Sequence, residues 1–100
     1  MQNLQVQIVT TALSDDAAPR VVTVQTDNRD QVRWELARAR EGWPAQTEAP
    51  ALFTAYVAWS ALARGGDLQG MKFADFQQTV IASTASLVDV DPTRAAPAAD

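Results

Sequence analysis

The sequence predicts an α+β fold, mainly α, in which an N-terminal β-hairpin packs on a three-helix bundle and a disordered C-terminal tail follows. Three observations predict this fold. Within residues 4–26, apolar and polar residues alternate with a period of two in two separate runs, which is typical of the half-buried strands of a hairpin. Apolar residues then recur at helical spacing between capping residues, and the chain ends in a stretch rich in alanine, proline and aspartate.

Two alternating runs form the predicted hairpin. Leu4, Val6 and Ile8 share one side of the first run, and Val22 and Val24 share one side of the second. A polar stretch with two aspartates and a proline separates the runs and supplies the turn. A two-stranded hairpin is marginally stable alone, so we expect it to lie on the helices or on another subunit.

The first helix is predicted over residues 28–41. Asp27 precedes it as a good N-cap, Gly42 is a suitable residue to end it, and Pro44 prevents its continuation. Its apolar residues fall on one face at helical spacing: Val32, Leu36 and Ala39.

The second helix is predicted over residues 50–64, from an initiating Pro50 to a pair of glycines that follow Arg64. The fifteen residues between Glu48 and Arg64 include no charge, so this helix is apolar around most of its circumference. Such a helix must be central in the bundle or must meet another chain. Because a domain of about 85 ordered residues covers a central helix with difficulty, the pattern favours self-association or client binding.

The third helix is predicted over residues 73–87. Its expected inward residues are Phe73, Phe76, Val80, Ile81, Leu87 and Val88. Its expected outward residues are Asp75, Gln78, Ala82 and Ser86. Residues 1–88 are thus expected to form a single folded domain, and residues 89–100 a disordered tail or linker, because their apolar content is too low to offset the ordering entropy.

Composition argues against several classes of function. Eight lysines and arginines stand against twelve aspartates and glutamates, and this net charge of −4 disfavours a general nucleic-acid binder. The sequence has no histidine and no cysteine, which leaves out imidazole and thiolate metal ligands, disulfides and the usual general base. We therefore expect that the protein is not an enzyme and that it binds no metal, no cofactor and no small-molecule ligand.

The charge balance and the length of the apolar run argue against nucleic acid and membranes as partners. The four arginines of the first helix are balanced by four carboxylates: Asp27, Asp30, Glu35 and Glu41 against Arg29, Arg33, Arg38 and Arg40. The uncharged run of the second helix is shorter than the roughly 18–20 apolar residues that cross a bilayer. The N-terminus has neither the basic start nor the apolar run of a signal peptide, so a cytosolic location is expected.

Aromatic residues are the candidate partner-binding residues of this chain. Trp43 lies in the interhelical turn "GWP", where it either plugs the bundle or anchors a partner. The full candidate set is Trp43, Phe53, Tyr56, Trp59, Phe73 and Phe76. For each of them the alternative is a place in the core, where aromatics at helical spacing are usually found.

Two stretches of the chain resemble a known family. "DNRDQVRWELARAREGWP" followed by "EAPALFTAYVAWSALARGG" resembles the small tail assembly chaperones of long-tailed, siphovirus-type phages of actinobacteria. The resemblance covers about residues 21–91. It consists of a hairpin, a helix ending in a tryptophan–proline turn, a helix rich in alanine and aromatics, an aromatic-anchored third helix and an acidic tail.

This resemblance implies a non-enzymatic role in virion assembly. Such chaperones are thought to coat the helical, aggregation-prone tape measure protein until the tail tube polymerises, and they are absent from the mature virion. The implied location is the cytoplasm of the infected bacterial host. In many relatives a programmed frameshift appends a second domain, for which residues 89–100 would be the linker.

Two other functions stay open at the level of sequence. A small structural or connector protein of the virion tail or neck would remain in the particle and pair its hairpin edge with neighbours. A DNA-binding regulator would use the arginines of the first helix, against which their charge balance argues.

Overall fold

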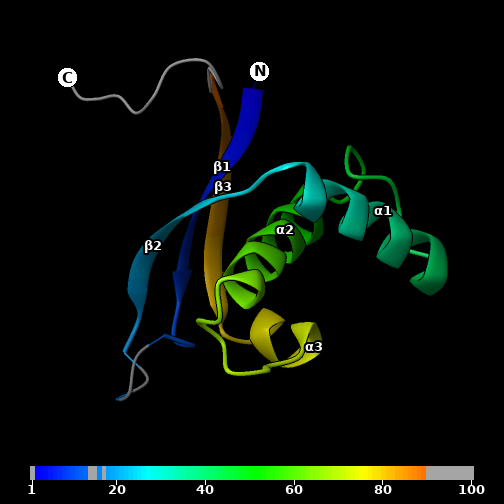
Figure 1. Cartoon of the computed structure of the whole chain (residues 1–100). Coiled ribbons are helices and arrows are strands. Elements are labelled where there is room, and N and C mark those ends of the chain that lie inside the picture. The colour runs from blue at the N-terminus through cyan, green and yellow to red at the C-terminus, as the bar shows by residue number, and fades with distance from the viewer. Residues whose placement is uncertain (1, 14–15, 17, 90–100) are drawn as a thin grey trace.

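The computed structural model describes residues 2–13, 16 and 18–89, and Figure 1 shows the path of the chain. These residues form three strands and three helices. The elements are β1 (Gln2–Thr10), β2 (Arg20–Gln25), α1 (Asn28–Glu41), α2 (Pro50–Arg64), α3 (Phe73–Gln77) and β3 (Val80–Asp89). The tail expected from residue 89 onward lies outside the described residues, apart from Asp89 at the end of β3.

The three strands form one antiparallel sheet in the order β2-β1-β3, so β1 is central and both of its edges are paired. Gln7 of β1, for example, lies opposite Thr23 of β2 and opposite Thr84 of β3. Successive side chains alternate between the two faces of a sheet. Val6 and Ile8 face the helices and are fully buried, and the helices lie on this one side of the sheet (Figure 1).

Helix α2 occupies the centre of the molecule (Figure 1). It contacts all three strands and both other helices, and every residue from Phe53 to Ala58 is buried. This position explains why its sequence has no charge between Glu48 and Arg64, since a helix covered on opposite sides has little room for solvated side chains. The strand β3 supplies part of the cover that a hairpin and two helices alone would lack.

The predicted third helix over residues 73–87 is wrong, and so is the predicted three-helix bundle, whereas the predicted hairpin is present as the antiparallel pair of β1 and β2. Helix α3 ends at Gln77, and after a short turn the chain continues as the strand β3. β3 pairs antiparallel with β1 along its length. The fold is therefore a three-stranded antiparallel sheet with helices on one face.

Two physical properties of β3 favour a strand over a helix. Its sequence "VIASTASLVD" is rich in valine, isoleucine, threonine and serine, residues that lose side-chain freedom in a helix or compete with its backbone hydrogen bonds. In addition, a hairpin of β1 and β2 leaves one edge of β1 with unpaired backbone groups. β3 pairs with this edge, whereas a third helix would leave it to solvent.

Helix α1 begins and ends at residues whose local chemistry fixes its bounds. The Asp27 carboxylate accepts a hydrogen bond from the backbone N–H of Arg29 at 2.9 Å, and the Asp30 carboxylate accepts one from the N–H of Asp27 at 3.0 Å. The Asp27 side chain also accepts from the backbone N–H of Asp30, and this bond and its reciprocal from Asp27 N–H to the Asp30 side chain form a capping box. Gly42 ends the helix with a φ of 75°, a left-handed conformation in which glycine has no steric penalty.

The face of α1 that packs on the core differs from the face on which the aliphatic residues recur. Trp34 and Ala37 are buried against α2 together with Asp30. Val32 and Leu36 are 43% and 64% exposed, and Ala39 is exposed as well. The aromatic ring of Trp34 contributes more buried area than the aliphatic side chains would, so it sets the orientation of the helix.

Candidate protein-binding surfaces

The aromatic residues proposed as partner anchors lie in the core or pack against it. Phe53, Tyr56 and Phe76 are buried, with exposed fractions of 8%, 4% and 0%. Trp43 and Phe73 are half-buried at the margin of the same core. Trp59, also half-buried, belongs to this margin. In this arrangement the three buried rings have almost no surface with which to contact a partner.

Five of the six candidates share one aromatic cluster, joined through α2. The ring of Tyr56 lies 4.9 Å from that of Phe73 and 5.3 Å from that of Trp59, measured between centroids. Trp43 stacks on Trp34 of α1 at 5.7 Å, with an angle of 24° between the rings. Phe53 joins through an edge-to-face contact with Trp34 at 5.3 Å. Such contacts between rings stabilise the fold. Trp43 takes part in them although it lies in the turn after α1.

The polar edge of Trp59 is also engaged within the chain. Its indole N–H donates to the backbone carbonyl of Met71 at 2.9 Å, which ties the loop before α3 to α2. The guanidinium carbon of Arg33 lies 4.5 Å from the ring centroid of Trp59. This cation–π contact connects α1 to α2 and covers part of the indole face.

Sequence reasoning missed a buried polar network between α1 and α2. Asp30 is 1% exposed, and its carboxylate accepts hydrogen bonds from Ser60 Oγ at 2.7 Å and from Arg64 Nη2 at 2.6 Å. Ser60 and Arg64 are four residues apart and so share one face of α2. That spacing, next to an acidic helix start, is the only sequence signal of the network. Every polar bond of Asp30 is internal, which indicates a structural role.

Asp27 lies at the solvent side of this network. Arg29 donates to its carboxylate from Nη2 at 2.6 Å, and Arg64 Nη2 lies 3.7 Å away. The side-chain hydrogen bond from Arg29 lowers the pKa of Asp27 to about 2, although partial burial acts in the opposite direction. Asp27 therefore stays ionised, as its capping role at the positive end of α1 requires.

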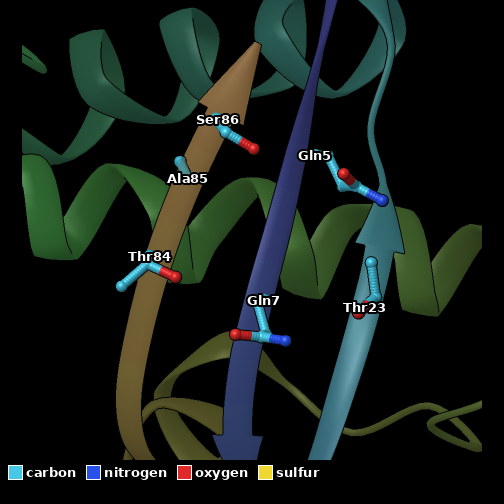
Figure 2. A pocket seen from close by; sticks show the side chains of 6 residues that line it. All are labelled: Gln5, Gln7, Thr23, Thr84, Ala85 and Ser86. Atoms are coloured by element: carbon cyan, nitrogen blue, oxygen red, sulfur yellow. The ribbon is translucent and has the colours of Figure 1, made fainter. Parts of the chain in front are cut away.

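The face of the sheet that points away from the helices is open to solvent and uncharged. Figure 2 shows Gln5, Gln7, Thr23, Thr84 and Ser86 projecting from this face, with α2 behind the sheet. They border a shallow hollow of about 230 Å³. The other described side chains at positions of this face, Val9, Val21, Gln25 and Ala82, are uncharged as well. This surface has polar groups for weak hydrogen bonds and no charge that would repel another surface.

The outer face of α1 is the best candidate for binding a helical partner. Val32 and Leu36 are one helical turn apart and exposed, and Ala39 continues the row. We call these three residues the α1 stripe. By helical position, one flank of the stripe carries three arginines: Arg29, Arg33 and Arg40. Arg29 and Arg40 also pair with the carboxylates of Asp27 and Glu41, and Arg33 lies over the ring of Trp59. An apolar row with a basic flank is complementary to an amphipathic helix whose apolar face is bordered by carboxylates.

Neither the side chains of the described residues nor comparisons with other proteins assign a function. Within the described residues, no group of three or more histidines, cysteines, aspartates or glutamates is arranged to hold a metal ion. In the same part of the chain, none of the helices has the length and hydropathy needed to span a membrane. Comparison with models of known families, with curated proteins and with solved structures finds no match.

Proposed function

We propose that the chain is a non-enzymatic tail assembly chaperone that binds the tape measure protein of a long-tailed phage and keeps it soluble until the tail tube polymerises. The observation that supports this proposal most directly is the α1 stripe, where Leu36 exposes 64% of its surface on a helix that is otherwise held firmly by its inner face. The resemblance of residues 21–91 to such chaperones agrees with this reading.

The stripe defines the chemistry of the client. A tape measure protein is long and helical, so it offers amphipathic faces at helical spacing. Packing such a face on Val32 and Leu36 would cover the 43% and 64% of these side chains that are exposed, so each contributes less than the about 1.5–3 kcal/mol of complete burial. A contact of this size is weak alone, and many copies bound along one repetitive client reach useful occupancy through avidity.

Co-expression with the tape measure protein tests this function. We expect the wild-type chain to keep the client in the soluble fraction and Leu36→Asp to lose most of that effect, because an aspartate repels the acidic flank of the client. Val21→Asp is the matched control, since Val21 is 66% exposed and lies on the sheet, away from α1. Both substitutions are on exposed side chains, so thermal unfolding of each variant will verify that the fold is retained.

The proposal fails if Leu36→Asp protects the client as well as the wild type does. It also fails if Val21→Asp loses protection equally, because the effect would then not depend on the α1 stripe.

A second function is favoured by the uncharged open face of the sheet. A structural or connector protein of the virion tail would use such a face to pack permanently against its neighbours. Mass spectrometry of purified virions distinguishes the two functions, because a connector remains in the particle and a chaperone does not.

A further inference from the structure

Within the described residues, β3 is an edge strand without the features that usually protect an edge. It runs for ten residues on the outside of the sheet, while the other edge strand, β2, has six residues and begins with the exposed Arg20. From residue 76 to residue 88 the sequence has no charge and no proline. Natural sheets usually interrupt an exposed edge with lysine, proline or a covering segment. β3 is therefore suited to pairing with another strand.

The backbone groups that β3 directs outward follow from the pairing of β1. The carbonyl of Leu4 accepts a hydrogen bond from Thr26 N at 3.0 Å, so Leu4 directs its backbone groups away from β3. In an antiparallel ladder this direction alternates from residue to residue. Gln5 and Gln7 therefore face β3, and their partners Ser86 and Thr84 use their backbone groups within the sheet. The outward N–H and C=O groups belong to Ser83, Ala85 and Leu87.

The sequence of β3 is nearly symmetric about Thr84. Going outward from this residue, each position on one side has a counterpart of similar size on the other. The pairs are Ser83 with Ala85, Ala82 with Ser86, Ile81 with Leu87 and Val80 with Val88. Two copies of β3 laid antiparallel with Thr84 opposite Thr84 would match small residues with small ones and large aliphatic residues with each other. In this register the outward groups of Ser83 and Ala85 also meet, as a hydrogen-bonded pair requires.

The same register covers two apolar side chains that are exposed in the single chain. Ile81 and Leu87 expose 62% and 64% of their surface, and each would lie opposite the other in the paired copy. Beside Ile81 there is a groove of about 330 Å³, to which Leu52 and Ala55 of α2 contribute. Leu87 of the second copy would lie opposite Ile81, which borders this groove, so its side chain would reach the groove. The one register shift in the ladder lies between Val9 and Thr10 and leaves Ile81 without a partner on β1, so the regular part of this register runs from Ala82 to Ser86.

We infer that β3 pairs antiparallel with β3 of a second copy about a two-fold axis at Thr84, joining the two sheets into one continuous sheet. This interface is isologous, so it closes as a dimer. It does not depend on the proposed function, because the α1 stripe lies on a different part of the molecule.

Sedimentation equilibrium of charge variants at the axis tests the register. In Thr84→Lys, and separately in Thr84→Glu, like charges meet across the axis, and we expect dimerisation at least about tenfold weaker than in the wild type. An equimolar mixture of the two variants places opposite charges together and should recover the wild-type affinity to within about threefold. Thr23→Lys is the matched control, because Thr23 flanks Gln7 on the other side of the same face and should dimerise as the wild type does.

Three results would overturn the inference. One is a wild-type chain that stays monomeric up to about 1 mM. Another is a mixture of Thr84→Lys and Thr84→Glu that remains as weak as either variant alone, since this excludes an axis at Thr84. The third is a control Thr23→Lys that weakens the dimer as much as Thr84→Lys does, which would assign the contact to the open face instead of the edge. The recovery in the mixture requires folded variants, so misfolding alone cannot produce the expected pattern.

Discussion

The carboxylate of Asp30 joins the start of α1 to the end of α2 through a few short bonds. It accepts from the N–H of Asp27, from Ser60 Oγ and from Arg64 Nη2, while only 1% of its side chain reaches solvent. A buried charge is expensive to desolvate and is tolerated only when its lone pairs are satisfied. The stability of this helix pair therefore depends on keeping every partner of Asp30 in place.

Removing the guanidinium of Arg64 tests this dependence. We expect Arg64→Met, which keeps most of the apolar stem, to lower the free energy of unfolding by about 2 kcal/mol, because the buried carboxylate loses its cation. The side chain of Arg64 is 32% exposed, which places the loss below that of a fully buried pair. Arg38→Met on the exposed side of α1 is the control and should change the stability by less than about 0.5 kcal/mol. Equal losses in urea denaturation of both variants would contradict a specific role for Arg64.

At the scale of elements, sequence patterns located some parts of the fold and misassigned one. Helices α1 and α2 lie between capping residues that act locally, such as Asp27, Gly42 and Pro50, so their positions were readable from the sequence. The identity of β3 depends on the edge of β1, some seventy residues earlier in the chain, as the pairing of Val9 with Ala82 shows. Helical spacing of apolar residues in a short segment carries no information about such a distant edge.

Proline substitutions distinguish a strand from a helix at residues 80–89. Thr84 directs its N–H to β1 in the observed register, so Thr84→Pro should lower the free energy of unfolding by roughly 2–3 kcal/mol. The N–H of Ala85 points outward, and Ala85→Pro should cost less than about 1 kcal/mol when measured below the dimerisation range. In a helix over residues 73–87 both prolines would be interior and similarly damaging. A similar loss for the two variants would therefore contradict the strand.

The described part of the molecule has a closed core, with the α1 stripe, the β3 edge and the open face of the sheet outside it. The aromatic residues that the sequence predicted as partner anchors pack around α2, where they fill or border the hydrophobic core. Helical spacing could not predict which aromatic residues belong to the core. Trp34 and Trp43, for example, stack because the turn after α1 brings Trp43 back to the helix. The α1 stripe and the β3 edge remain exposed, one basic at its flank and the other uncharged. We propose that they serve different partners.

Binding of a purified helical fragment of the tape measure protein, measured by isothermal titration calorimetry, tests the proposed client surface most directly. We expect saturable binding with a negative heat-capacity change, the mark of buried apolar surface. Leu36→Asp should weaken it at least about tenfold, which corresponds to a loss of about 1.4 kcal/mol. Ile81→Lys at the β3 edge should leave it unchanged. Binding that survives Leu36→Asp undiminished, or that is lost in Ile81→Lys, would contradict the assignment of the client to α1.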